Sequence, residues 1–198
     1  MTAALSESPT SELFSLDRYR VRRKVLKLFG GRFHVYAGDR VVGFSKQKAF
    51  ALKEDIRVFA DESMAREILA IRARQVVDFK AAYDILDPVT GVKVGAARRR
   101  GFASIVRDSR ELLDAEDRVL GKLQEDSLGM ALLRRFLANF VPQRFRLAVH
   151  GAASISFRQD FNPFIYRLNV AIPASHPLDR RLVFALAVLI CAIEGLQS

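Results

Sequence analysis

The sequence predicts a mainly β fold: a closed antiparallel barrel of about twelve strands that encloses a hydrophobic helix near the C-terminus. Two observations carry this prediction. A hairpin-sized pattern recurs every 26 residues through much of the chain, and the chain closes on a segment that is apolar on every side. One additional amphipathic helix is expected between the repeated hairpins and the last strands. Residues 1–14 are expected to form a disordered tail, and residues 15–198 a single domain.

The repeat is visible in short motifs. GDRVVGF, residues 38–44, returns as EDRVLGK, residues 116–122, three periods of 26 residues later. Each unit contains two alternating runs of apolar and polar residues around a turn rich in Asp, Gly, Pro or Ser, which predicts a β-hairpin. The best-aligned column holds Gly43, Leu69, Gly95 and Gly121, and the column before it holds Val42, Ile68, Val94 and Leu120.

Further strands flank the repeats. YRVRRKVLKLF predicts a basic first strand, and RFRLAVH, AASISFRQ and FIYRLNVAI predict three strands after residue 143. Between the repeats and these three strands, apolar residues from Leu128 to Phe140 recur at helical spacing, and Pro142 ends the pattern. This stretch is the predicted additional amphipathic helix.

The closing segment predicts a helix over about residues 179–194. Asp179 suits its start and Gly195 suits its end, and every residue from Leu182 to Ile193 is apolar. A helix without a polar face must be surrounded by lipid or by protein. Twelve residues span about 18 Å, against about 30 Å of hydrocarbon in a bilayer. The sequence therefore favours a helix inside the barrel over a membrane anchor.

These same segments resemble a known family. The ending YRLNV…HPLDRRLVFALAVLICAIE is similar to the close of LURF-one-related proteins and of phospholipid scramblases, and KAFAL, residues 48–52, is similar to the K-x-F-x-L pattern of LURF-one-related proteins. The resemblance extends from about Tyr19 to Glu194. It implies the barrel of the tubby C-terminal-like superfamily, in which tubby proteins bind phosphoinositides.

The chain also departs from the scramblase pattern. It has no acidic calcium loop, no cysteine cluster and no proline-rich N-terminal segment, and Cys191 stands where the family often has an acidic residue. These differences argue against calcium-triggered lipid scrambling.

The formal net charge of +10 comes mostly from arginine and favours an anionic partner. We expect anionic phospholipid headgroups or a membrane surface; nucleic acid and an acidic protein are the other partners that the charge allows. A single cysteine excludes an intrachain disulfide, and residues 1–14 lack the basic and apolar regions of a secretory signal. The predicted location is the cytoplasm, with peripheral attachment to the inner face of the membrane.

Basic residues repeat with the hairpins. Lys46, Arg72 and Arg98 share one column, and Lys48, Arg74 and Arg100 share another, two residues later. Strict alternation places these six on the face of Val42, Ile68 and Val94. They line one mouth of the barrel if that face is inward, or form a belt if it is outward. These six residues are the predicted anion-binding site, and a solvated rim without a ligand is the alternative.

Two other basic segments are candidates for the same role. The arginines of the first strand, among them Arg18, Arg20 and Arg22, either extend the patch or form an ordinary outer face. In the predicted amphipathic helix, Arg134, Arg135 and Phe136 are candidates for membrane contact, with packing onto the barrel as the alternative.

Little in the sequence predicts catalysis. His34, His150 and His176 are far apart and have no metal-ligand spacing, and Cys191 lies in the apolar helix, where a thiol is unreactive. We therefore expect no enzymatic activity, no cofactor and no metal. The favoured function is a non-enzymatic barrel that associates with membranes or binds phospholipid headgroups. The alternatives are scramblase-like movement of lipids and a nucleic-acid-binding or regulatory interaction scaffold. The sequence leaves the oligomeric state open.

Overall fold

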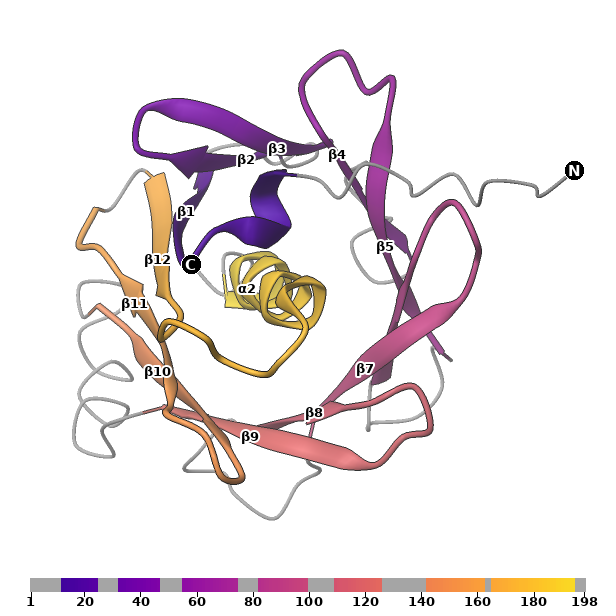
Figure 1. The fold of residues 1–198 in the computed structure, drawn as a ribbon. Helices are drawn as coiled ribbons and strands as arrows, with labels where there is room; N and C mark the ends of the chain where they lie inside the picture. The colour runs from indigo at the N-terminus through magenta and orange to yellow at the C-terminus, as the bar shows by residue number, and fades with distance from the viewer. Residues whose placement is uncertain are drawn as a thin grey trace, which may run out of the picture.

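The repeated units fold as consecutive β-hairpins, and these hairpins form most of a closed barrel in the computed structural model (Figure 1). The structure describes residues 12–24, 32–46, 55–74, 82–99, 109–125, 142–162 and 165–194. Its strands are β1 (Arg18–Lys24), β2 (Arg32–Ala37), β3 (Arg40–Lys46), β4 (Asp55–Phe59), β5 (Glu67–Ala73), β6 (Ala82–Leu86), β7 (Lys93–Arg99), β8 (Arg110–Leu113), β9 (Val119–Glu125), β10 (Arg144–Val149), β11 (Ile155–Gln159) and β12 (Ile165–Ala171). The 3-10 helix η1 (Glu12–Ser15) precedes them, and the helix α2 (Arg180–Glu194) follows.

Each strand pairs with its neighbours in sequence, and β1 pairs with β12 along its whole length, which closes the sheet. The predicted fold class, a closed antiparallel barrel around a C-terminal helix, is confirmed. The ladder is thinnest between β3 and β4, which pair at Phe44 and Phe59 alone, while Ser45 Oγ donates to the carbonyl oxygen of Arg57 beside that pair. The predicted amphipathic helix over residues 128–140 lies outside the described residues.

Each repeated hairpin contains a β-bulge at the same place in the repeat. In the first hairpin Val35 opposes Gly43 and Tyr36 opposes Val41, so Val42 is an extra residue on β3. The same register shift makes Ile68, Val94 and Leu120 the extra residues of the other three hairpins. The apolar column that reveals the repeat is therefore the column of bulges.

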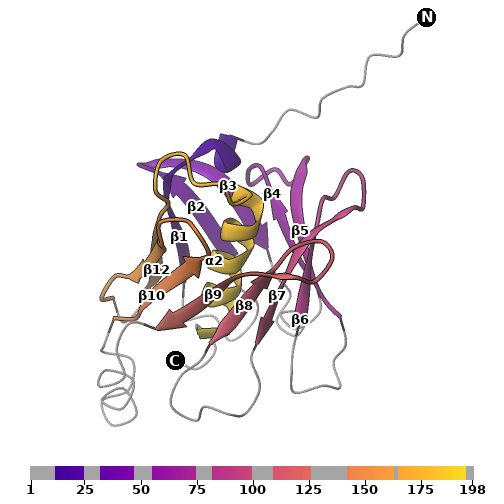
Figure 2. The ribbon, with the colours of Figure 1, turned by 60° about the horizontal axis from the view of Figure 1, so that its bottom comes forward.

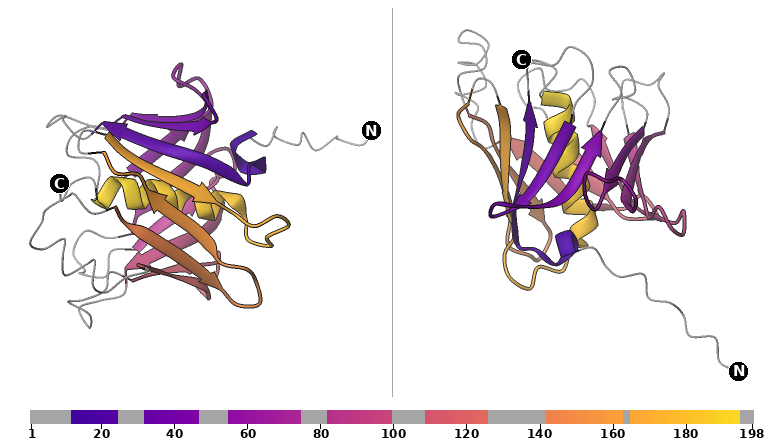
Figure 3. Two further views of the ribbon diagram at one scale, coloured as in Figure 1. Left: turned by 90° about the vertical axis from the view of Figure 1, so that its left-hand side faces the viewer. Right: turned by 90° about the horizontal axis from the view of Figure 1, so that it is seen from above.

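Helix α2 runs through the lumen of the barrel (Figure 3). Its residues from Leu182 to Ala192 are all buried, and inward side chains of the strands, such as Ile71 and Leu112, belong to the same core. This is the environment predicted for a helix without a polar face. Among the described residues, no helix combines the length and the apolar composition needed to cross a bilayer.

Polar side chains hold both ends of α2. The Asp179 carboxylate accepts a hydrogen bond from the backbone N–H of Arg181 and so caps the first turn, which is why the helix begins at Arg180. At the other end, the buried Arg23 donates from Nη1 to the carbonyl oxygens of Cys191 and Ala192, at 3.0 and 3.2 Å. These carbonyls belong to the last turn of the helix, where the helix supplies no partner of its own.

The prediction of a disordered tail as far as residue 14 is wrong for residues 12–14, which belong to η1. Leu13 is buried against Gly43 of β3, and Phe14 packs on Phe184 of α2 with the ring centroids 6.1 Å apart. η1 thus covers the end of the barrel at which α2 begins (Figure 2). Two adjacent apolar residues in an otherwise polar segment supply the burial that orders it. Residues 1–11 lie outside the described residues.

Candidate anion-binding surface

The described members of the predicted cation columns lie on the outside of the barrel. Lys46 and Arg72 are exposed, whereas their neighbours Ser45 and Ile71 are buried. Because each bulge interrupts the alternation, Val42 and Ile68 nevertheless reach the core. The prediction that the cations share a face with the apolar bulge column is therefore wrong. Of the two arrangements that alternation allows, the outward belt is the one observed.

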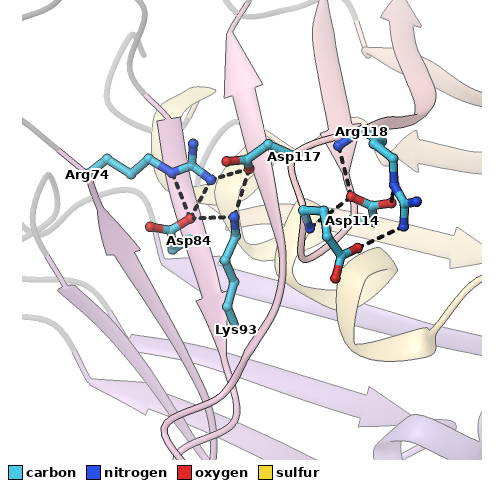
Figure 4. Close-up of polar contacts among 7 residues, drawn as sticks. Arg74, Asp84, Lys93, Asp114, Asp117 and Arg118 are labelled. Carbon is cyan, nitrogen blue, oxygen red and sulfur yellow. Dashed lines mark hydrogen bonds and ion pairs between the residues drawn. The ribbon is translucent and has the colours of Figure 1, made fainter.

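Arg74 belongs to an ion cluster on this outer surface (Figure 4). Its guanidinium donates to Asp84, with Nε 2.7 Å from Oδ1, and also to Asp117. The Nζ atom of Lys93 lies 2.8 Å from Asp117 Oδ1. These hydrogen bonds from Arg74 and Lys93 lower the pKa of Asp117 to about 2. Two cations and two carboxylates balance one another, so the cluster joins neighbouring hairpins and leaves little charge for an external anion.

The other members of the predicted site differ from one another in their contacts. Arg98 is 2.6 Å from Glu111 of β8 and is neutralised by it. Lys46 and Arg72 form no ion pair within the described part of the chain. Lys48 and Arg100 lie outside the described residues, as do the candidate membrane-contact residues Arg134, Arg135 and Phe136.

A denser basic surface covers β10, β11, β12 and β1, which are adjacent in the barrel. Inward residues of these strands, such as Phe145, Leu168 and Val21, are buried in the core, so alternation turns their neighbours outward. Seven of the outward side chains are arginines, and we call this surface the arginine face: Arg18, Arg20, Arg22, Arg144, Arg146, Arg158 and Arg167.

Two pairs of arginines on this face oppose each other across neighbouring strands. Arg22 on β1 opposes Arg167 on β12, and Arg144 on β10 opposes Arg158 on β11. Like charges directly opposite each other destabilise a sheet. None of these four residues forms an ion pair with any residue that the structure describes. The fold therefore brings four positive charges together here, and no carboxylate of the described residues forms an ion pair with them.

Asn169 and Asp160 are the polar neighbours at the centre of the face. The Oδ1 atom of Asn169 accepts from Arg20 Nε at 2.8 Å, and its Nδ2 donates to Asp160 Oδ1 at 2.7 Å. The Asp160 carboxylate is thus bound to an amide, and no guanidinium of the described residues forms an ion pair with it.

Elsewhere on the outer surface, no ion pair with a described residue is found for Lys46, Arg72, Arg32 or Lys122. Several other cations there have carboxylate partners. Besides the pairs already described, these are Arg40 with Glu12, Arg57 with Asp55 and Glu67, and Arg118 with Asp114 and Glu116. The arginine face differs in holding two directly opposed pairs of arginines, none of which forms an ion pair with a described residue.

Most of the arginine face escapes the sequence prediction, which considers only its β1 members. The available signal was the period of two in RFRLAV and FRQ, where arginines alternate with apolar residues. Alternation gives the face of each residue, but the adjacency of β1 and β12 follows only from closure of the barrel.

The other polar groups considered in the sequence are dispersed. His34 Nε2 lies 2.5 Å from Glu62 Oε1, His150 is exposed in a turn, and His176 Nδ1 accepts from the backbone N–H of Leu178. Burial raises the pKa of the Cys191 thiol, which keeps it protonated. Within the described ranges there is no group of three or more His, Cys, Asp or Glu placed to hold a metal ion.

Comparison of the chain with protein-family models, with curated proteins and with solved structures finds no match.

Proposed function

We propose that this protein is a non-enzymatic module that associates peripherally with anionic phospholipid membranes through the arginine face. The observation that carries this proposal is the separation of charge around the barrel. Several cations elsewhere on the surface are paired with carboxylates, whereas the arginine face holds two opposed arginine pairs that have no carboxylate partner within the described part of the chain. An external layer of phosphate groups would supply the missing counter-charge.

Arginine suits this role because its planar guanidinium forms bidentate hydrogen bonds with phosphate oxygens and stays charged at any physiological pH. A basic side chain near an anionic leaflet contributes about 1 kcal/mol. The arginine face lies on four adjacent strands, and four of its arginines, Arg22, Arg144, Arg158 and Arg167, have no ion pair with a described residue. The resemblance of the closing strand and helix to the tubby C-terminal-like superfamily agrees with a lipid partner.

The same charge would also attract nucleic acid. Single-stranded nucleic acid is usually held by aromatic side chains on which the bases stack. The outward residues of β10, β11, β12 and β1 whose side chains are described include no aromatic residue. A membrane surface, which needs only phosphate contacts, is therefore favoured over a single strand, and duplex binding becomes an outcome of the test below.

Flotation with vesicles tests the proposal. The protein is mixed with phosphatidylcholine vesicles that contain or lack phosphatidylserine, at low and at physiological salt. We expect flotation with the anionic vesicles alone, and weaker flotation at higher salt, because the Debye length falls to about 8 Å at physiological ionic strength. Equal flotation with vesicles that contain or lack phosphatidylserine would contradict the proposal. Preferential binding of the protein to duplex DNA or RNA would contradict it as well.

Two triple variants with the same loss of charge locate the surface. Replacing Arg22, Arg158 and Arg167 by Gln removes both members of one opposed pair and one member of the other. This variant is expected to partition onto anionic vesicles roughly a hundredfold more weakly. The matched control replaces Arg72, Arg74 and Arg98, the three described arginines of the sequence-predicted site, and is expected to float like the unchanged protein. If the control loses binding and the first variant keeps it, the membrane surface lies on β5 and β7 instead.

A further inference from the structure

We propose that His34 and Glu62 make the binding of the arginine face to anionic membranes dependent on pH, with stronger binding at mildly acidic pH than at neutral pH. This inference rests on the proposed function and adds a regulation of the same surface. The Nε2 atom of His34 lies 2.5 Å from Oε1 of Glu62. Histidine is the side chain that changes charge between about pH 5 and 8. The pair carries one negative charge while the imidazole is neutral, and no net charge once the imidazole is protonated.

The pair lies at the border of the arginine face. His34 on β2 directly opposes Arg22 on β1, which belongs to that face. The sequence neighbours of His34, Phe33 and Val35, are buried in the core, so alternation turns the imidazole to the outer side of the barrel. Glu62 belongs to the turn between β4 and β5 and reaches the imidazole from there. Its carboxylate is therefore connected to the arginine face through the side chain of His34.

Aromatic rings on two strands hold the imidazole in place. Its ring centroid lies 5.1 Å from that of Phe44 on β3 and 6.1 Å from that of Tyr36 on β2. The charged and titratable residues of the elements packed around it are Arg20 and Arg22 of β1, Arg32 and Tyr36 of β2, Lys46 of β3, and Asp61 and Glu62 of the β4–β5 turn. Within the described ranges, Glu62 is the residue that forms an ion pair with His34. A proton taken up by His34 is therefore balanced by this carboxylate.

Protonation changes the charge at this border and keeps the contact. Nε2 faces the carboxylate, so it donates to Glu62 both in the imidazolium and in the neutral tautomer with its proton on Nε2. The Glu62 side chain is 66% exposed, so at neutral pH its charge repels an anionic leaflet that approaches Arg22. At mildly acidic pH the imidazolium cancels that repulsion. One unit of charge near an anionic surface corresponds to about a fivefold change in the partition coefficient.

Flotation at two pH values tests the inference. The vesicles contain phosphatidylcholine with or without phosphatidylglycerol, because the phosphodiester of phosphatidylglycerol keeps its charge across this range. We expect the unchanged protein to partition onto the anionic vesicles about fivefold more strongly at about pH 5.5 than at about pH 7.5. Equal flotation at the two pH values overturns the inference and leaves the proposed function standing. Absence of flotation with the anionic vesicles at both pH values overturns both proposals.

Three variants assign the effect to this pair. His34→Gln leaves Glu62 charged at both pH values, so it should remove most of the dependence of partitioning on pH. Glu62→Gln removes the carboxylate, so it should partition about fivefold more strongly than the unchanged protein at about pH 7.5. The matched control is His150→Gln, which replaces an exposed histidine in the β10–β11 turn and should keep the dependence on pH. Loss of that dependence in His150→Gln, or its persistence in His34→Gln, would overturn the inference.

Discussion

Arg22 and Arg23 are consecutive residues of β1 with opposite surroundings. Arg22 points outward and opposes Arg167, with no ion pair to any described residue. Arg23 points inward, is 6% exposed, caps the last turn of α2, and lies with its guanidinium carbon 5.3 Å from the ring centroid of Phe33. Successive side chains of a strand point to opposite faces, so one arginine stabilises the fold and the next is available to a partner.

Charge reversal at Arg22 is expected to stabilise the barrel and to weaken membrane binding. In Arg22→Glu the new carboxylate opposes Arg167, so repulsion is replaced by attraction, with a gain in the free energy of unfolding of about 0.5–1 kcal/mol. Urea denaturation at low salt measures the gain, and flotation measures the loss of binding. The matched control Arg57→Glu removes ion pairs with Asp55 and Glu67, so it should lose stability and keep binding. Destabilisation by Arg22→Glu would mean that the opposed arginines do not repel each other.

The repeated hairpin is the element on which the prediction of the fold depends. The sequence places the four turns and the period correctly, because turn residues and alternating runs are local signals. It wrongly places the cation columns on the same face as the apolar bulge column, because a bulge inserts one residue and shifts every later side chain of the strand. A bulge depends on the register between two paired strands, which cannot be predicted from the sequence of either strand alone.

A glycine follows three of the four bulges and allows a close approach between strands. A Cβ atom at Gly95 would lie 2.4 Å from the carbonyl oxygen of Leu113 and 2.8 Å from Leu182 Cδ2 of α2. At Gly43 the nearest atoms would be side-chain carbons of Leu13 and Val35 at 3.2 Å, which can move. The position is crowded by backbone in one hairpin and by side chains in another, and Leu69 shows that one copy holds a full side chain there.

Gly95→Ala is therefore expected to lower the free energy of unfolding by about 1–3 kcal/mol, because the neighbouring backbone must shift. Gly43→Ala, the matched control at the same place in the repeat, should cost less than Gly95→Ala. Urea midpoints of the two variants check the order. Equal losses at the two positions would show that backbone crowding is not what selects glycine.

At the scale of the whole molecule, the apolar helix in the lumen is the feature that the sequence predicts best. Its residues from Leu182 to Ala192 have no polar face, its length is too short for a bilayer, and the strand count gives a barrel wide enough to hold it. The arginine face is the feature predicted least well. It consists of residues from the beginning and the end of the chain, which meet only when β1 pairs with β12.

The buried position of Cys191 allows the closure of the barrel around α2 to be tested by the reactivity of its thiol. Burial raises the pKa of this thiol, and the residue is fully enclosed, so we expect it to react with an aromatic disulfide reagent only after the barrel opens. The native rate should be at least about a thousandfold below the rate in denaturant. The variant Val89→Cys carries an additional, exposed thiol and should show one rapid and one slow reaction. Rapid reaction of Cys191 in the native protein would place α2 outside the lumen.

The order of the elements along the chain also governs how the molecule is made on the ribosome. The helix that fills the lumen follows all twelve strands, and the strand that closes the sheet against β1 comes immediately before it. Every hairpin therefore leaves the exit tunnel with its apolar side uncovered, and it has no permanent cover until β12 and α2 have also been synthesised. During that interval the uncovered apolar faces of the hairpins are exposed to aggregation.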